Sequence, residues 1–223
     1  MQPWKDIEAR AQKRMGGAAA LEAELPHPKS RAALLRVPDS RWLAELTRGV
    51  FQAGFVWRVI EAKWPGFEAA FDEFEVEKVA RYSEARLAKL AADERIVRNP
   101  QKIRATRANA QFLRELAAEH GSAARFFADW LENDIVGLWE VMRTRGSRLG
   151  GFTGQFALRH LGKDTPMFTD SVLKALRLEG VVEAKSPSSR AALQRVQEAF
   201  NAWREESGRP LCELSKILAL SVD

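Results

Sequence analysis

Apolar residues recur every three to four positions along almost the whole chain, and the alternating pattern of half-buried strands does not occur. This spacing predicts an all-α protein. The clearest expected helices begin at small polar residues and run from Asp39 to Trp64, from Ser83 to Ala92, from Asn99 to His120, and from Ser188 or Ser189 to Gly208. Asn99 followed by Pro100 is typical of an N-cap with proline in the first helical turn. Trp57 and Trp64 are therefore expected on one long helix.

Two segments, Leu25–Ser30 and Ala184–Ser189, have the proline, serine and lysine content of linkers. They set off an N-terminal arm of about residues 1–30 and C-terminal helices of about residues 186–223 from a central helical body. At 223 residues the chain has the length of one domain. We expect one domain over residues 1–223, in which the arm and the C-terminal helices form or complete a second lobe.

The composition permits a buried core and shows no sign of a membrane segment. Apolar residues make up 46% of the chain, an ordinary share for a globular protein. The longest apolar stretch is interrupted by Arg48 and Arg58, so no membrane span is expected. The N-terminal segment lacks the layout of a signal peptide, and cytoplasmic residence is therefore the default expectation.

Charged and metal-binding residues narrow the possible chemistry. With 35 Lys and Arg against 30 Asp and Glu, the net charge is +5, which permits a polyanionic partner without requiring one. Cys212 is the only cysteine, which excludes an intramolecular disulfide and a cysteine-based zinc site. The histidines His27, His120 and His160 match no metal-ligand spacing. We expect neither a metal ion nor a cofactor.

A turn rich in glycine and arginine separates two expected helices, residues 135–142 and 152–161. The turn contains Gly146, Gly150 and Gly151 together with Arg145 and Arg148. Glycines permit positive φ and close approach of a ligand to the backbone. Free N–H groups at the start of the second helix, beside two arginines, suit one DNA phosphate. The alternative is an ordinary corner between helices with solvated arginines.

A single acid, Asp170, follows the hairpin where the next helix, Ser171–Leu178, is expected to begin. Cleavage of an N-glycosidic bond develops positive charge on the deoxyribose, and a carboxylate facing that bond can stabilise the charge or orient the attacking water. The alternative is structural, because Thr169 or Asp170 can serve as the N-cap of the helix. Both roles stay open from the sequence.

An aromatic run over residues 51–57 ends at Trp57, three positions after Gly54. Enzymes that act on a base extrude it from the duplex, and an aromatic ring is a natural stacking partner for that base. The alternative for Trp57 is packing in the core.

These motifs occur in an order that resembles the DNA-3-methyladenine glycosylase I family. The first motif is the Gln-Ala-Gly-x-x-Trp run that ends at Trp57, and the second is the Ile-x-Arg-Asn-x-x-Lys-Ile run over residues 96–103, followed by Ala-Asn-Ala at residues 108–110. The likeness covers roughly residues 42–116. It resumes at the turn over residues 145–151, which is similar to the hairpin of the helix-hairpin-helix DNA glycosylase superfamily.

The resemblance implies a two-lobed, all-α helix-hairpin-helix fold with a lesion pocket between the lobes. It implies a monofunctional enzyme that removes a methylated purine from double-stranded DNA containing alkylated bases, and we expect a monomer. By position, Trp57 resembles the family's base-stacking tryptophan, and Phe51 and Gln52 belong to the same motif. Trp4, near a step at Arg14-Met15-Gly16 that resembles the family's N-terminal pocket segment, is a second expected wall.

The chain departs from the family at several places. The family's zinc clip between the termini is absent, because no cysteine or histidine precedes His27. Gly49 stands where the family has its pocket glutamate. Met15 replaces an aromatic residue, and two expected tyrosines have no match because Tyr82 is the only tyrosine of the chain. Recognition of 3-methyladenine in particular is left open by these differences.

The wider superfamily offers a partial replacement for the missing glutamate. Many members place a catalytic aspartate after the hairpin helix, at about the distance of Asp170 from Gly150. Bifunctional members place a lysine nucleophile just after the hairpin glycines, but residues 151–154 contain no lysine. A Schiff-base lyase step is therefore not expected.

The sequence thus predicts a base-excision glycosylase that hydrolyses the N-glycosidic bond of an alkylated purine. Two alternatives remain. One is a catalytically silent module that recognises damaged or bent DNA, which the missing glutamate and tyrosines favour. The other is a helical scaffold that binds a protein partner in an apolar groove.

Overall fold

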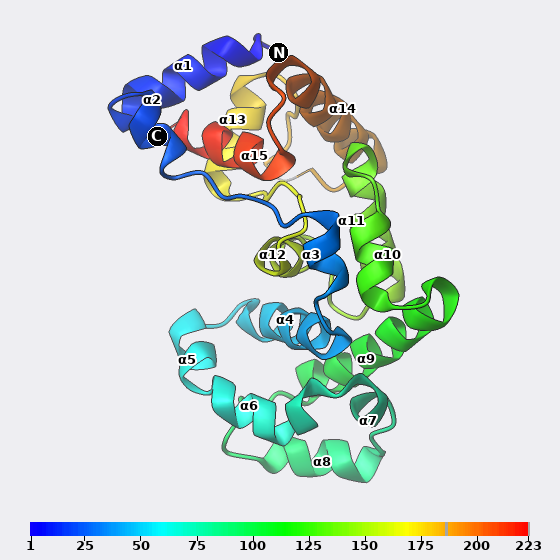
Figure 1. Ribbon diagram of the computed structural model, residues 1–223. Coiled ribbons are helices and arrows are strands. Elements are labelled where there is room, and N and C mark those ends of the chain that lie inside the picture. Colours follow the sequence, from blue (N-terminus) through cyan, green and yellow to red (C-terminus); the bar gives the residue numbers. More distant parts are fainter. Residues whose placement is uncertain (186, 223) are drawn as a thin grey trace. The chain divides into compact units, whose positions relative to one another are not determined.

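The computed structural model describes residues 1–185 and 187–222, and within them every regular element is a helix (Figure 1). The predicted all-α class is confirmed. The chain divides into two compact units. Unit 1 comprises Met1–Lys29, Leu131–Leu138 and the chain from Asp164 onward, and unit 2 comprises Ser30–Trp130 and Trp139–Lys163. Ser186, within the linker expected at Ala184–Ser189, lies outside the described residues.

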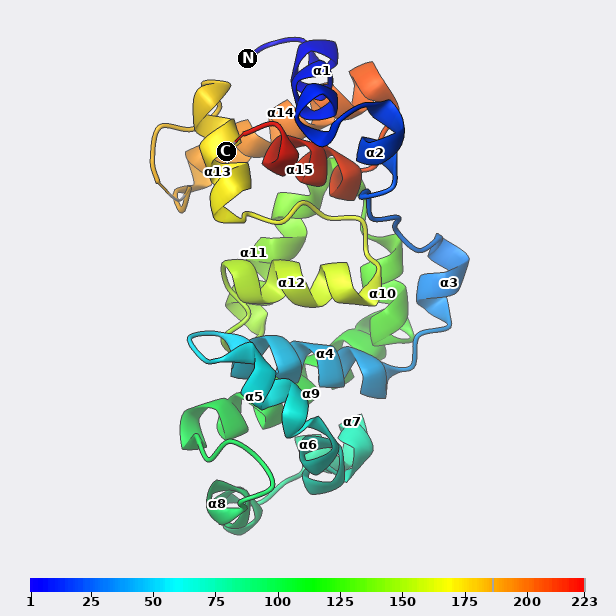
Figure 2. The ribbon, with the colours of Figure 1, turned by 90° about the vertical axis from the view of Figure 1, so that its left-hand side faces the viewer.

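Unit 1 is built around its C-terminal helix. Its helices are α1 (Trp4–Met15), α2 (Ala18–Glu22), η2 (Glu132–Asp134), α13 (Asp170–Leu178), α14 (Arg190–Ser207) and α15 (Leu211–Leu220). The largely buried α15 packs against α1, α13 and α14 (Figure 2). Its first N–H groups donate to the buried carboxylate of Asp164, from Leu211 at 3.0 Å and from Cys212 at 2.8 Å. A carboxylate at this end also complements the helix dipole.

Unit 2 contains the two motifs of the family resemblance. Its helices are α3 (Arg31–Leu35), α4 (Asp39–Gln52), α5 (Trp57–Ala62), α6 (Trp64–Ala70), η1 (Asp72–Phe74), α7 (Val76–Ala80), α8 (Glu84–Ala92), α9 (Pro100–His120), α10 (Ala123–Asp129) and α12 (Phe152–Leu161). The bounds of α11 (Ile135–Arg145) span the division between the two units. The central helix α4 packs against α9 and α12, and its Trp42 stacks on Phe127 with ring centroids 4.2 Å apart.

Three of the predicted helix starts are confirmed. The side chains of Ser83, Asn99 and Ser189 cap α8, α9 and α14 by accepting hydrogen bonds from backbone N–H groups. The ends of α9 and α14 are also as predicted, since Gly121 and Gly208 follow them in the left-handed conformation.

The prediction of a single helix from Asp39 to Trp64 is wrong. Helix α4 ends at Gln52, Gly54 turns the chain with a φ of +67°, and α5 begins at Trp57. Trp64 does not end a helix but begins α6. A proline follows in the first turn, where the backbone N–H that proline lacks would have no partner within the helix. Trp57 and Trp64 therefore lie on different helices.

Candidate functional site

A pocket of about 400 Å³ lies in unit 2, within the size range of small-molecule sites. It is formed by the end of α4, the turn after it, the start of α5 and the start of α12. The lining residues are Gly49, Gln52, Ala53, Gly54, Trp57, Phe152, Thr153 and Phe156. Two motifs that are about 100 positions apart in the sequence, the Gln-Ala-Gly-x-x-Trp run and the hairpin helix, therefore build one cavity.

Trp57 forms an accessible aromatic wall of this pocket. Its side chain is 46% exposed, and its ring meets that of Phe156 edge to face at 5.0 Å between centroids. Large apolar side chains are also exposed nearby in the sequence, at Phe55, Val56 and Val59, and Phe152 of the pocket lining is exposed as well. Core packing, the alternative role considered for Trp57, does not fit this exposure. An aromatic pocket wall among exposed apolar side chains is typical of a binding site.

Phe51, expected at the base, is instead a core residue. It is fully buried and packs edge to face on Phe67 at 4.7 Å between ring centroids. The next residue, Gln52, is 5% exposed and is one of the residues that line the pocket. The helical period explains the difference, because adjacent residues of α4 point about 100° apart.

The turn between α4 and α5 is fastened by a lysine that the sequence motif contains but whose role sequence reasoning missed. The ammonium group of Lys102 donates to the carbonyl oxygens of Phe51 at 3.0 Å and Ala53 at 2.7 Å. A cation at these orphan carbonyls stabilises a helix end. Burial lowers the pKa of Lys102, and the charge of Arg148 lowers it further. The pocket turn is thus held by α9.

Gly49 lies on the pocket surface where the family has a glutamate. A Cβ atom added there would lie 3.2 Å from the carbonyl oxygen of Thr153 and 3.3 Å from its Cγ2. These distances are shorter than ordinary van der Waals contacts, so Thr153 would have to move to admit a side chain. The absence of a carboxylate at position 49 is thus matched by the packing of α12 against α4.

The hairpin turn joins α11 to α12, as predicted. Gly151 adopts a φ of +59°, whereas Gly146 is needed for close packing, since an added Cβ would lie 2.5 Å from Leu149 Cδ1. Gly150 does not adopt the positive φ that was considered for it. Arg148 does, with a φ of +59°, and this strained backbone turns the residue out of the hairpin into solvent.

The two arginines of the turn differ in their partners. Arg145 pairs with Glu119 at 2.7 Å and with Glu115 at 3.4 Å, and the bond with Glu119 is the main cause of its raised pKa. Arg148 is exposed and bonds to the neutral amide of Gln101. A phosphate would have to compete with carboxylates for Arg145 but not for Arg148. At the same end, α12 begins without a side-chain cap, which leaves N–H groups for an anion.

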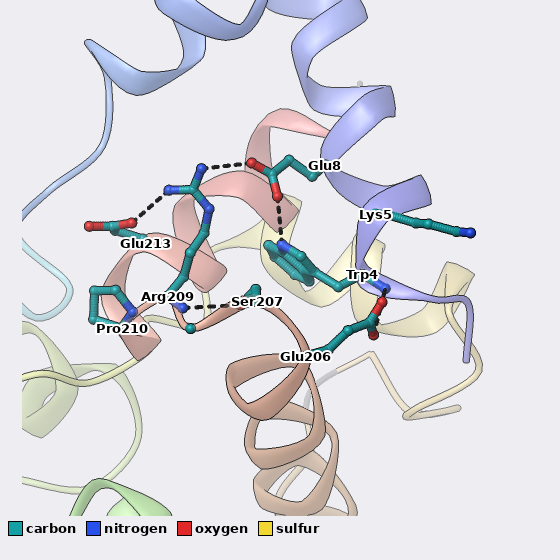
Figure 3. A pocket seen from close by; sticks show the side chains of 9 residues that line it. Trp4, Lys5, Glu8, Glu206, Ser207, Arg209, Pro210 and Glu213 are labelled. Carbon is teal, nitrogen blue, oxygen red and sulfur yellow. Dashed lines mark hydrogen bonds and ion pairs between the residues drawn. The ribbon is translucent and has the colours of Figure 1, made fainter.

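Trp4 lines a different cavity, which lies in unit 1 (Figure 3). This cavity measures about 580 Å³, and Trp4 is only 2% exposed. Its indole N–H donates to Glu8 at 2.8 Å, and its ring lies 5.9 Å from that of Trp203. The second base-stacking wall expected from the sequence therefore has a packing role within unit 1.

An arginine beside Trp4 ties the chain termini of unit 1 together. Arg209 pairs with Glu8 on α1 at 2.7 Å, with Glu22 on α2, and with Glu213 on α15 at 2.9 Å. The bond with Glu22 is the main cause of the raised pKa of Arg209, and the same bond lowers the pKa of Glu22. These pairs join α1, α2 and α15 within unit 1. Among the described residues no group of His, Cys, Asp or Glu side chains is arranged to hold a metal ion.

Asp170 is the first residue of α13 and belongs to unit 1. The hydroxyl of Thr169 accepts a hydrogen bond from Val172 N at 3.3 Å, so the cap is Thr169. The exposed carboxylate of Asp170 is therefore free of the capping role that was its alternative explanation.

The pocket brings together the Gln-Ala-Gly-x-x-Trp run and the helix after the hairpin, two of the features that carry the family resemblance. The model of the methyladenine glycosylase family matches residues 36–145. The match covers just under half of the chain, and it confirms the family resemblance predicted from the sequence. No helix in the described ranges is both long and apolar enough to span a membrane.

Solved structures are similar to part of this chain. The structure of a 3-methyladenine DNA glycosylase I shares 18% sequence identity with this chain and has a TM-score of 0.50, over 65% of this chain and 85% of the other. A structure that concerns 3-methyladenine recognition by the Staphylococcus aureus enzyme shares 22% identity, with a TM-score of 0.47, over 65% of this chain and 84% of the other. The family match supports a base-excision repair glycosylase and gives no support to a catalytically silent module.

Proposed function

We propose that this protein is a base-excision DNA glycosylase that hydrolyses the N-glycosidic bond of an alkylated, 3-methyladenine-like purine in double-stranded DNA. The observation that carries the proposal is the pocket of unit 2, in which the exposed ring of Trp57 lies beside the helix that the hairpin introduces. The pocket takes the extruded base, and the turn before α12 takes the DNA backbone. Both lie within one compact unit.

The pocket residues have distinct roles in this reaction. Trp57 stacks on the extruded base, which contributes about 1–3 kcal/mol per base by the usual scale. Arg148 and the first N–H groups of α12 bind a phosphate and fix the register of the duplex without reading its sequence. Lys102 keeps the turn after α4 in place and thereby the pocket wall that Gln52 and Ala53 form.

The chemical step needs little from the protein when the base is alkylated at a ring nitrogen. Such a purine carries a positive charge, and it departs as a neutral base when the bond from C1′ to N9 breaks and both electrons remain on the base. The deoxyribose then holds positive charge until a water oxygen adds to C1′ and releases a proton. Asp170 is our candidate for the carboxylate that stabilises this charge. Because residues 151–154 offer no lysine, the product is an intact abasic site.

The test is release of free base from duplex DNA treated with a methylating agent, followed by chromatography under multiple-turnover conditions. We expect 3-methyladenine in the supernatant and abasic sites in the DNA, without strand cleavage before alkali treatment. Binding of this DNA without release of any base would contradict the proposal. Function as a monomer in the cytoplasm, expected from the sequence, is part of the same proposal and is tested by sedimentation and by fractionation.

A further inference from the structure

Gln52 is one of the residues that line the pocket, and its side-chain amide is bonded to the neighbouring helix. It is the last residue of α4, and its Nε2 donates to Glu61 Oε1 on α5 at 2.9 Å. A glutamine amide can present either its NH₂ group or its oxygen. A carboxylate only accepts hydrogen bonds, so Glu61 selects the orientation in which the NH₂ group points away from the ligand side.

Glu61 is itself held in place by a buried arginine. Arg48, one turn before Gln52 on α4, forms an ion pair with the carboxylate of Glu61 through Nη1. The guanidinium of Arg48 lies 3.8 Å from the centroid of the Trp64 ring, and its side chain is only 13% exposed. A planar cation on an aromatic face is a preferred arrangement. Glu61 is thus held close to Gln52.

The oxygen of Gln52 is consequently the group left for the pocket. Gln52 lines the pocket, and Oε1 has no hydrogen-bond partner among the described residues. The other polar side chain of the lining, Thr153, lies on the opposite helix, α12. A ligand that donates a hydrogen bond satisfies Oε1. A ligand that places a carbonyl oxygen there forms no hydrogen bond, because both oxygens are acceptors.

We infer that Gln52 is the specificity-determining residue of this pocket, oriented by Glu61 to accept a hydrogen bond from the exocyclic amino group of an extruded base. The inference rests on the proposed function and deepens it, because it names the residue that reads the C6 position of the base and the residue that orients it. Gln52 touches the base, and Glu61 is a positioning residue. No carboxylate at position 49 is required for this selection.

The test compares two free bases, 3-methyladenine with an amino group at C6, and 3-methylhypoxanthine with a carbonyl group at C6 and a hydrogen on a ring nitrogen. Their affinities for the whole protein are measured by ligand-observed NMR titration. We expect the wild type to prefer 3-methyladenine by about tenfold, the scale of one hydrogen bond exchanged for a clash between acceptors. Gln52→Leu should lose the preference while it keeps the stacking on Trp57.

Glu61→Gln is the decisive variant, because a carboxamide at position 61 can either donate or accept. Gln52 can then turn its NH₂ group to the pocket, and the preference should fall to roughly twofold or less while 3-methylhypoxanthine binds more tightly than before. Glu68→Gln is the matched control. Glu68 lies on α6, accepts a hydrogen bond from Trp64 Nε1 at 3.0 Å, and has no contact with Gln52.

The possible outcomes bear differently on the role of Gln52 and on the proposed glycosylase function. A wild type that binds both bases equally overturns the role of Gln52 but leaves the glycosylase proposal intact. If Glu61→Gln weakens both bases by the same factor, Glu61 only supports the fold and the orienting role is wrong. If the wild type binds neither base, the pocket is not a base site, and both this inference and the assignment of that pocket are overturned.

Discussion

Asn109 holds the hairpin turn through both ends of its side chain, with Oδ1 accepting from Ser147 N at 2.7 Å and Nδ2 donating to Ser147 O at 3.1 Å. Asn109 is fully buried on α9, two helical turns after Lys102, which fastens the pocket turn. One rigid helix thus positions both the proposed backbone grip and the proposed base pocket.

Asn109→Ala should loosen the hairpin. Two backbone groups of Ser147 lose their partners, and the free energy of unfolding should fall by about 1–3 kcal/mol. Affinity for damaged and undamaged duplex should fall together, because we propose that the turn binds phosphates. Thr106→Val is the control, because Thr106 is equally buried on α9 but bonds only to its own helix, at Lys102 O. If Thr106→Val weakens DNA binding as much, the effect belongs to α9 as a whole.

Arg148→Ala should weaken binding of damaged and undamaged duplex by a similar factor, because phosphate contacts position the protein and do not specify the base. The slope of log affinity against log salt should fall by roughly one unit. Arg145→Ala should change the slope less, since Arg145 is already paired with Glu119 and Glu115. Fluorescence anisotropy at several salt concentrations measures both. If the slope of log affinity against log salt is unchanged in Arg148→Ala, the turn does not bind DNA through Arg148 and only connects two helices.

Trp57→Ala should separate base binding from stability. The ring is 46% exposed, so the loss of unfolding free energy should be well below the 3–5 kcal/mol typical of a buried aromatic residue. Affinity for a free methylated base should fall by about 1–3 kcal/mol. Phe51→Ala is the comparison, since Phe51 is fully buried and should show the large loss of stability. Equal destabilisation by both variants would contradict the pocket assignment.

Asp170→Asn tests the proposed electrostatic role. Thr169 provides the cap of α13, so the variant should fold with a melting temperature close to that of the wild type. Single-turnover release of base should fall by on the order of 10²–10³, the scale for removal of one preorganised electrostatic group. DNA affinity should hold or rise slightly, because a negative charge is lost. Release at the wild-type rate would refute the role of Asp170.

Arg209→Met should destabilise unit 1 in a pH-dependent way. Loss of the ion pairs at this partly exposed site should lower the free energy of unfolding by about 1–3 kcal/mol at pH 7. Arg209 lowers the pKa of Glu22 below 4.5. A lowered carboxylate pKa stabilises the folded state above the unfolded pKa, and this contribution is lost as the pH falls through the folded value. Thermal melting should therefore show the two proteins converging below about pH 4. A difference independent of pH would contradict this ionic account.

The sequence predicts those features that depend on local interactions. Ser83, Asn99 and Ser189 were recognised as caps because a capping side chain acts within three residues of its own position. The turn at Gly54 was missed because the lysine that fastens it comes 49 positions after Ala53. The apolar pattern continues across the turn, and it does not show where the backbone breaks.

The candidate site was predictable only in part for the same reason. The motif identifies Trp57 and Gln52, and the structure places both at one pocket. The same motif includes Phe51, and only the packing against Phe67 shows that this ring is buried. The orientation of Gln52 by Glu61 depends on a break between α4 and α5 that the sequence did not indicate.

The most direct test of the central claim is the release of methylated purine by the wild type and by Trp57→Ala under single-turnover conditions, on duplex DNA carrying methylated bases. The pocket account predicts release by the wild type, and a rate at least tenfold lower for Trp57→Ala at unchanged melting temperature and unchanged affinity for undamaged duplex. Release by Trp57→Ala at the wild-type rate would show that the base is removed elsewhere in the protein. No release by the wild type from any alkylated duplex would contradict the enzymatic function itself.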